Sequence, residues 1–371
     1  MVFRAELITD LAGLERIRDG WDTLAEHLGR PFSSPAWTLA WWRHAAPPGG
    51  ELRVIAVVDG GTVSAVAPFF VEGRRYRLLA SDASLGVEPL AAPGAERATI
   101  ELTAAALAGA QPRPDIVELG GISSGSPWPE LLRETWPGRR RPSLRRDLSL
   151  PLPALELGGR TYEEWFASQS SSFRHQARRL RRRLVEQGGQ FRLAAGEEDL
   201  ARGLPAFAAL HHARWRARGG SGVLTPCVEA MLPDAARELA GEGRFRLWLT
   251  EVEGQVIGAD VWLAAGGEVS QWLGGFDEAW AQANVSLLSM LAAIEDCFER
   301  GDRRIDLGGG RAELKSRVAE SEDSLEHYLL LPPGPRRPLV AASLLPGRLR
   351  RAVAERLPPG VKTRLKRLLR R

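Results

Sequence analysis

Residues 244–277 read RFRLWLTEVEGQVIGADVWLAAGGEVSQWLGGFD. Apolar runs in this stretch are broken at Glu253-Gly254 and at a pair of glycines, which predicts three strands joined by two tight turns. The next segment, residues 284–302 (NVSLLSMLAAIEDCFERGD), predicts a helix, and residues 303–309 (RRIDLGG) predict a short strand. A strand meander followed by a helix and another strand indicates an α+β unit.

The first part of the chain contains a similar series of elements. Residues 33–45 (SSPAWTLAWWRHA) predict a helix with Ser33 or Ser34 as N-cap and a proline in the first turn. Residues 51–72 predict a β-hairpin around an Asp-Gly-Gly turn, and residues 115–121 (DIVELGG) predict a buried strand. Because strand, acidic–glycine turn and strand recur in the same order, we predict two copies of one α+β unit.

The length of 371 residues exceeds one ordinary hydrophobic core, so we predict two domains and a tail. A Pro/Arg-rich stretch near the middle of the chain lies where a boundary would fall. The predicted limits are residues 1–150, 151–331 and 332–371. The tail contains 12 Lys and Arg residues against one acid, whereas the preceding residues have a net charge of −7. A body with net negative charge argues against a general nucleic-acid binder.

Two further features limit the class of protein. No apolar run approaches the ~20 residues that a membrane-spanning helix needs, and the N-terminal residues contain acids and no extended apolar core, unlike a secretory signal. Cys227 and Cys297 are too few for a disulfide framework and too far apart for a metal-binding pattern. We therefore expect a cytoplasmic protein without a metal cofactor.

Five segments, taken in order, resemble one protein family. They are FSSPAWTLAWWRH (32–44), SSFRHQARRLRRRL (171–184), LHHARW (210–215), GGFDEAWAQANVSLL (274–288) and IDLGGGRAELKSRV (305–318). The chain resembles GNAT-superfamily acetyltransferases of the CelD/BcsL type, which are linked to cellulose or exopolysaccharide synthesis and related to the tandem-GNAT Fem aminoacyltransferases. The resemblance implies an α+β fold of tandem GNAT-like domains, each a mixed, mostly antiparallel sheet flanked by helices.

The resemblance also implies an acetyl-CoA site in the C-terminal domain. A helix N-terminus offers unpaired N–H groups and partial positive charge to a pyrophosphate, and Asn284 is a favourable cap residue there. Backbone N–H groups of the preceding strand would supply donors for the thioester oxyanion. The implied cofactor-binding residues are Trp272, Leu273, Gly274, Asn284, Val285, Ser286 and Leu287. The family usually has glycine where this chain has Ser286.

Lys315 is the only lysine in the first 361 residues of a chain with 47 arginines. A compact ammonium is not replaced well by a planar guanidinium at a tight oxyanion or phosphate position, and in Fem-type relatives a lysine in this loop contacts the acyl-transfer site. Asp306, Glu313 and His211 are candidate bases for deprotonating an amine or hydroxyl acceptor. Each also has a structural alternative. Asp306 can cap a turn, Glu313 can be a solvated surface residue, and His211 can pack beside Trp215.

Residues 171–187 predict a cationic helix with a narrow apolar stripe and six exposed arginines. Arg174, Arg178 and Arg181 fall on one face, where they can gather phosphates of a nucleotide-sugar or lipid-linked acceptor. A second interpretation is that the helix is simply a solvated surface, and a third is that it binds nucleic acid.

Three other motifs are weaker. Residues 309–316 (GGRAELKS) approach a phosphate-binding P-loop, but Leu314 replaces its second glycine. Residues 121–125 (GISSG) match the nucleophile elbow of α/β-hydrolases around Ser123, but no helix is predicted to begin at that serine. The adjacent histidines at 211 and 212 point about 100° apart on a helix, so we expect no zinc site.

The implied function is transfer of an acetyl or other acyl group from acyl-CoA to an amine or hydroxyl of a saccharide or cell-envelope precursor. Two alternatives remain open. One is tRNA-dependent aminoacyl transfer of the Fem type, and the other is a non-catalytic accessory role in a polysaccharide synthase. The acyl-CoA hypothesis expects no nucleic-acid partner. Residues 361–369 of the tail place leucines along one side, which predicts peripheral contact with the inner face of a membrane, with a disordered tail or a protein dock as alternatives.

Overall fold

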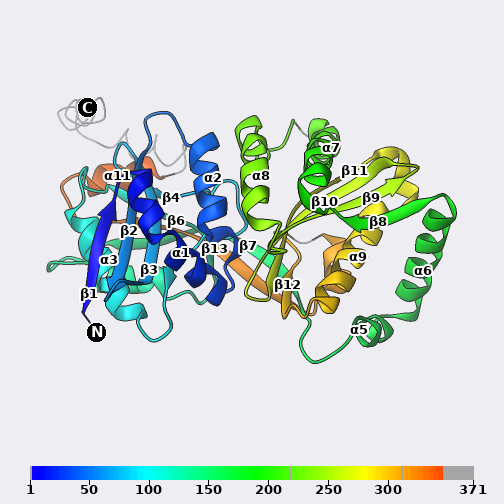
Figure 1. Cartoon of the computed structure of the whole chain (residues 1–371). Helices are drawn as coiled ribbons and strands as arrows, with labels where there is room; N and C mark the ends of the chain where they lie inside the picture. The colour runs from blue at the N-terminus through cyan, green and yellow to red at the C-terminus, as the bar shows by residue number, and fades with distance from the viewer. Residues whose placement is uncertain (1, 218, 311, 346–371) are drawn as a thin grey trace.

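The computed structural model describes residues 2–217, 219–310 and 312–345. Within them, thirteen strands form one mixed sheet, with helices on both faces (Figure 1). The N-terminal elements occupy one end of the sheet and the C-terminal elements the other, and we call these two ends the N-terminal half and the C-terminal half. No helix in these ranges is both long enough and apolar enough to cross a membrane.

The N-terminal half confirms the elements expected from the sequence. Ser34 caps the first Trp-rich helix, since its side chain accepts a hydrogen bond from the Trp37 N–H. The strands are β1 (Phe3–Ile8), β2 (Glu51–Asp59), β3 (Thr62–Glu72), β4 (Arg75–Leu78), β5 (Leu90–Ala91) and β6 (Ile116–Ser123). The helices are α1 (Leu11–His27), α2 (Pro35–Ala45), α3 (Glu96–Gly109) and α4 (Trp128–Thr135), with a 3-10 turn at Pro31–Ser33.

The C-terminal half confirms the meander, helix and strand predicted over residues 244–309. Its strands are β8 (Gly189–Leu193), β9 (Phe245–Val252), β10 (Gln255–Ala265), β11 (Glu268–Phe276) and β12 (Arg304–Asp306). Its helices are α5 (Tyr162–Ser168), α6 (Ser171–Glu186), α7 (Gly196–Arg216), α8 (Pro226–Leu239), the 3-10 helix η2 (Glu278–Ala283), α9 (Val285–Glu299) and α10 (Glu313–Val318).

Two long strands, β7 (Ser143–Glu156) and β13 (Ser321–Leu331), join the halves at the centre of the sheet. The local strand order is β4-β6-β13-β7-β12-β11, so β13 pairs with β6 of the N-terminal half and β7 pairs with β12 of the C-terminal half. The Pro/Arg-rich stretch is therefore largely a strand. The predicted limit at 150 falls inside β7, and the domain limits remain a prediction.

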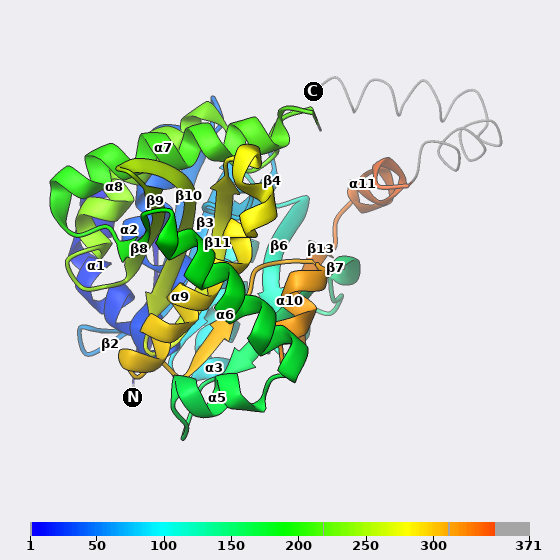
Figure 2. The ribbon, with the colours of Figure 1, turned by 90° about the vertical axis from the view of Figure 1, so that its right-hand side faces the viewer.

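The helices lie in two layers (Figure 2). One face of the C-terminal half packs α7 and α8 into a large apolar core shared with α1 and α2, and the other face packs α5, α6 and α9 into a second core. The apolar stripe of α6 is buried as predicted. Its predicted cap at Ser171 or Ser172 is wrong by one residue, because Ser170 directly precedes the helix and accepts from the Phe173 N–H. The described part of the tail contains α11 (Arg337–Ser343), and residues 346–371 lie outside the described ranges.

Candidate active site

Strands β11 and β12 run parallel but pair over only three positions, ending with Ser270 opposite Asp306. β11 continues to Phe276, whereas β12 ends at Asp306. In the part of the chain that the structure describes, β11 therefore has no strand partner on this side beyond Ser270. We call this opening the split. The backbone of an unpaired strand edge can bind an extended ligand as an additional strand.

A β-bulge interrupts β11 beside the split. The register with β10 shifts at Trp272, which has no cross-strand partner there. The indole of Trp272 is buried and turned toward the N-terminal half, where its N–H donates to the Ala83 carbonyl at 2.9 Å and its ring meets Trp37 edge-on. Only the backbone of this residue is therefore available to a ligand, and the oxyanion role predicted for this strand remains a prediction.

Two glycines let neighbouring groups approach β11 closely. A Cβ atom at Gly274 would lie 2.0 Å from Asp260 Oδ1, and one at Gly275 would lie 2.4 Å from the His211 backbone nitrogen. Neither position accommodates a side chain without a shift of its neighbours. Leu273, which precedes them, is half-buried.

Helix α9 begins beyond the split, and its first residues differ from the predicted cap. Asn284 adopts a left-handed conformation (φ +53°) and its side chain makes no capping hydrogen bond, because η2 runs directly into α9 and Asn284 joins the two helical segments. The N–H groups of Val285 and Ser286 have no hydrogen-bond partner among the described residues. The Val285 and Leu287 side chains are buried and Ser286 is half-buried, so backbone N–H groups are what this helix offers an anion.

The ammonium group of Lys315 lies at the split. Its Nζ donates to the Gly309 carbonyl at 3.2 Å. A Cβ atom at Gly308 would lie 3.0 Å from the same Nζ and 2.9 Å from the carbonyl oxygen of Gln271 on β11. Burial, together with the charge of Arg214, lowers the pKa of Lys315 to about 8. The geometry thus places this lysine against the strand edge, and its catalytic role remains a prediction.

Asp260 on β10 faces the same region and was not predicted. Its Oδ2 accepts a hydrogen bond from Ser289 Oγ at 2.6 Å, and its Oδ1 accepts from Gln271 Nε2 at 3.4 Å. Burial raises the pKa of Asp260 to about 6. The signal was present in the sequence, since an acid in the middle of an apolar strand (GADVW) is uncommon unless it has a partner or a function.

Arg214 of α7 connects these groups electrostatically. Its guanidinium lies 5.2 Å from the centre of the Phe276 ring at the end of β11. Its charge lowers the pKa of both Lys315 and Asp260, although burial remains the larger influence on Asp260. An acid, an amine and a guanidinium thus lie around the unpaired part of β11.

Two of the predicted bases are poorly placed for proton transfer. His211 is only 1% exposed, with Nδ1 3.1 Å from the Gly274 carbonyl and Nε2 2.9 Å from Ser221 Oγ. Burial lowers the pKa of His211, and both ring nitrogens are occupied, so the residue connects α7 to β11. The carboxylate of Glu313 is exposed and pairs with Arg317 one turn along α10.

Asp306 lines a cavity of about 280 Å³ between the two halves. Its carboxylate accepts from Ser270 Oγ and contacts Arg304, each at 3.3 Å, and burial raises its pKa. The N-terminal half contributes Arg30 and Leu85 to the wall. Since Ser270 and Asp306 form the last pair before the split, this cavity opens where the two strands separate.

The three arginines predicted to gather phosphates contact three different groups instead of converging. Arg174 donates to the Ala167 carbonyl at 3.0 Å, Arg178 lies over the Phe166 ring, and Arg181 pairs with Glu295 at 3.0 Å. Their role in substrate binding remains a prediction.

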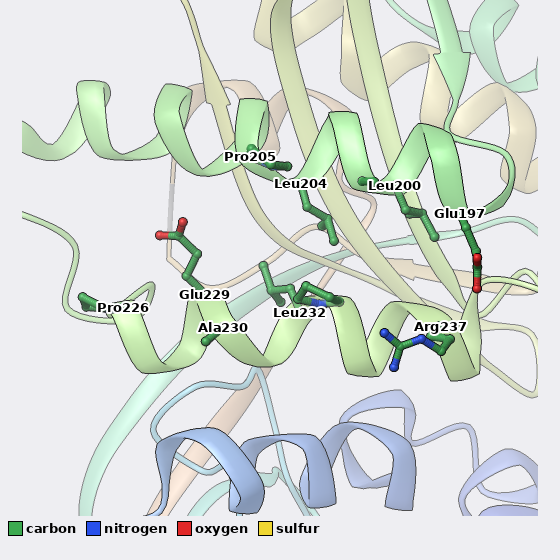
Figure 3. Close-up of a pocket in the computed structure, with 11 residues that line it drawn as sticks. Glu197, Leu200, Leu204, Pro205, Pro226, Glu229, Ala230, Leu232 and Arg237 are labelled. Carbon is green, nitrogen blue, oxygen red and sulfur yellow. The ribbon is translucent and has the colours of Figure 1, made fainter.

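Another cavity, of about 650 Å³, lies between α7 and α8 (Figure 3). Leu200, Leu204 and Leu232 line it, with Glu197 and Glu229 also facing it, and none of the predicted site residues does. No helix starts at Ser123, since α4 begins at Trp128. In the described ranges, no group of His, Cys, Asp and Glu side chains is arranged to hold a metal ion.

Residues 171–316 match the family model described as an acetyltransferase (GNAT) domain. Solved structures similar to the chain include FemX, with a TM-score of 0.59 and 12% identity over 86% of this chain and 96% of that one. Another is the C-terminal domain of a putative lysylphosphatidylglycerol synthetase from Agrobacterium fabrum, with a TM-score of 0.57 and 11% identity over 90% of this chain and 94% of that one. A third is L-PGS from Bacillus licheniformis, with a TM-score of 0.54 and 13% identity over 91% of this chain and 97% of that one.

No protein of curated function matches the chain in sequence. The similarities in structure establish the fold, which is that of tandem GNAT-like domains with a mixed, mostly antiparallel sheet. The predicted fold class is confirmed. The CelD/BcsL type remains a prediction.

Proposed function

We propose that the protein transfers an acyl group, most simply acetyl, from acyl-CoA to an amine or hydroxyl acceptor. The observation that carries this proposal is the unpaired edge of β11, with Lys315 beside it and the open N-terminus of α9 beyond it. A thioester carrier has an extended amide-containing arm and a pyrophosphate. The strand edge suits the arm, and the free N–H groups of Val285 and Ser286 suit the pyrophosphate.

The residues at the split support direct attack in a ternary complex. The nucleophile forms a bond to the thioester carbonyl carbon, the C–S bond breaks, and CoA leaves as its thiolate. The proton lost by the nucleophile passes to Asp306 in the interface cavity, since this carboxyl has a raised pKa and lies where the strands separate. The Lys315 ammonium and backbone N–H groups of β11 stabilise the negative charge that develops on the carbonyl oxygen.

The acceptor class that we propose is a saccharide or cell-envelope precursor, on the strength of the sequence resemblance. Both halves line the interface cavity, so the N-terminal half contributes to acceptor binding in this proposal. We further propose that the enzyme acts in the cytoplasm, with peripheral membrane contact through the tail.

Aminoacyl transfer from tRNA is a second candidate because α6 carries an exposed row of arginines, including Arg179, Arg182 and Arg183. Calorimetry with acetyl-CoA, longer acyl-CoAs, free CoA and aminoacyl-tRNA separates the candidates. We expect acyl-CoA and CoA to bind and tRNA to give no heat. Binding of charged tRNA without CoA would favour aminoacyl transfer, and no binding of either would favour a non-catalytic accessory protein.

A further inference from the structure

A second polar cavity, of about 310 Å³, lies in the N-terminal half where the basic C-terminal segment begins. Its walls come from the turn before β4, the end of α3, the loop before β6, the segment after α4 and residues 332–337. It shares no lining residue with the interface cavity beside the split. It is therefore a separate site from the one at β11.

The cavity has a strong excess of positive charge. Four arginines line it (Arg74, Arg113, Arg336 and Arg337), and Asp115 is the one acid among its described lining residues. The Oδ2 atom of Asp115 lies 3.0 Å from the Nε atoms of both Arg74 and Arg336. A single carboxylate shared by two guanidinium groups cannot neutralise them both.

The other two arginines add uncompensated charge. Arg113 is exposed and forms no ion pair with any residue that the structure describes. Arg337 donates to neutral oxygens, the Arg141 carbonyl and Ser143 Oγ, which leaves its positive charge unpaired. The lining thus has a formal charge of +3 around a cavity that also has a rigid wall, formed by the buried Trp136 and by prolines.

We propose that this cavity binds a phosphate group. Guanidinium groups present forked N–H donors that match phosphate oxygens, and such pairs are stronger than single-point contacts with an ammonium. A free phosphate at pH 7 carries ~1.5–2 negative charges, as phosphorylated side chains do, and a phosphodiester carries one, so either offsets part of the +3 charge of the lining. The same chemistry occurs in the headgroup of an anionic phospholipid and in a free phosphate compound.

The cavity includes the first residues of the basic C-terminal segment. Arg336 and Arg337 belong to the segment 332–371, which has 12 Lys and Arg residues and one acid. A ligand held in the cavity therefore lies beside the first residues of a strongly cationic segment.

The test uses the full chain with inorganic phosphate, pyrophosphate and sulfate in calorimetry at fixed ionic strength. Arg113→Gln is the first variant because Arg113 has no ion-pair partner whose loss would disturb folding. Arg16→Gln on α1 is the matched control, since it removes the same charge from an exposed arginine that lines neither this cavity nor the interface cavity. We expect Arg113→Gln to weaken phosphate binding at least tenfold and Arg16→Gln to leave it unchanged. Arg113→Lys should give an intermediate loss of phosphate affinity, because it keeps the positive charge but loses the forked N–H donors of the guanidinium group.

Vesicle sedimentation distinguishes the source of the phosphate. If the ligand is a lipid, Arg113→Gln should reduce binding to phosphatidylglycerol vesicles more than Arg16→Gln does, with phosphatidylcholine vesicles as the background. If the two variants sediment alike but differ in phosphate calorimetry, a free phosphate compound is the ligand. Equal losses in calorimetry, or no phosphate binding by the unmodified chain, would overturn the proposal while leaving acyl-CoA binding untouched.

Discussion

The two halves of the sheet repeat one arrangement of strands, but they differ in what surrounds it. β4 and β6 run parallel over three positions, as β11 and β12 do. β4 ends at Leu78, one residue beyond its last pair with β6, whereas β11 extends six residues past Ser270. Among the described residues, only the C-terminal half therefore presents a long strand edge at this point.

The helices that follow these strands also differ at their first turns. α3 begins with Glu96, whose carboxylate already occupies the positive end of the helix, whereas α9 has no acidic residue in its first turn. The adjacent strands show a parallel difference. β3 has no ionisable residue between Thr62 and Val71, but β10 carries the buried Asp260. The N-terminal copy thus differs from the C-terminal copy at two features on which the proposed acyl transfer depends.

The N-terminal half instead supports the site from outside. The segment that follows β4 reaches the C-terminal half, where Ala83 accepts the Trp272 indole N–H and Leu85 lies against Gly308 and Gly309. The N-terminal copy of the fold therefore helps to position β11 and the loop after β12 in the C-terminal copy. Substitutions that exchange features between the halves can test this division.

The largest effect is expected when α9 is given the acidic first turn of α3. Ser286→Glu places a carboxylate where we propose that the pyrophosphate binds, so acyl-CoA affinity should fall about 100-fold, which corresponds to about 2.7 kcal/mol. Glu96→Gln in α3 is the matched change in the other half and should leave affinity unchanged. Calorimetry with CoA measures both. An unaltered dissociation constant for Ser286→Glu would place the cofactor elsewhere.

A smaller loss is expected for Lys315→Arg. The pKa of Lys315 is about 8, so its ammonium form predominates below pH 8 and is lost as the pH rises through that value. If the ammonium stabilises the developing oxyanion, the rate of the unmodified enzyme should fall above pH 8. The arginine variant, charged throughout, should lack this decline and turn over roughly 30-fold more slowly, or about 2 kcal/mol. Equal rates and equal pH profiles would show that this lysine has no special role.

Local patterns predicted the fold well because each depends on a few neighbouring residues. The Ser34 cap, the hairpin of β2 and β3, and the meander β9–β11 were all visible as turn and capping chemistry. The central strands were not, since β7 contains Pro151 and Pro153 and reads as a linker. Both prolines still offer carbonyl oxygens, which accept from the Gly310 and Leu307 N–H groups, and long-range pairing with β13 decides the strand.

The candidate site was only partly accessible from sequence for a similar reason. The position of Lys315 could be inferred from its rarity, but its contact with Gly309 depends on the loop after β12. The burial of His211 and the exposure of Glu313 depend on which helix faces β11, and that is a tertiary property. To predict that Asp260 belongs to the site, one would have to know that it contacts Ser289 of α9.

Asp260→Asn should make β10 resemble β3 and increase stability at neutral pH. Burial raises the pKa of Asp260 from 3.8 to about 6, so the folded chain binds this proton more tightly than the unfolded chain does. The free energy of unfolding therefore falls as the pH rises from about 4 to 6, and the loss persists at higher pH. The variant should be more stable than the parent by about 1–2 kcal/mol at pH 7.5 and by little at pH 4.5.

Thermal unfolding at the two pH values measures this difference. Asp19→Asn on the exposed face of α1 is the control for replacing one carboxylate by an amide. If Asp260→Asn is less stable than the parent at pH 7.5, the hydrogen bonds from Ser289 and Gln271 outweigh the cost of burying the charge.

The smallest effect is expected for the hydrogen bond between Trp272 and Ala83, which links the C-terminal half to the N-terminal half. Trp272→Phe removes the indole N–H and leaves the Ala83 carbonyl without that donor in a buried contact. Trp41→Phe is a matched control, because Trp41 is equally buried and its Nε1 has no hydrogen-bond partner in the described structure. Both substitutions remove similar ring volume, so the difference between their unfolding free energies in urea isolates the hydrogen bond. We expect Trp272→Phe to cost about 1 kcal/mol more. Equal losses would show that the N-terminal half supports β11 through packing alone, since the hydrogen bond would then contribute nothing measurable.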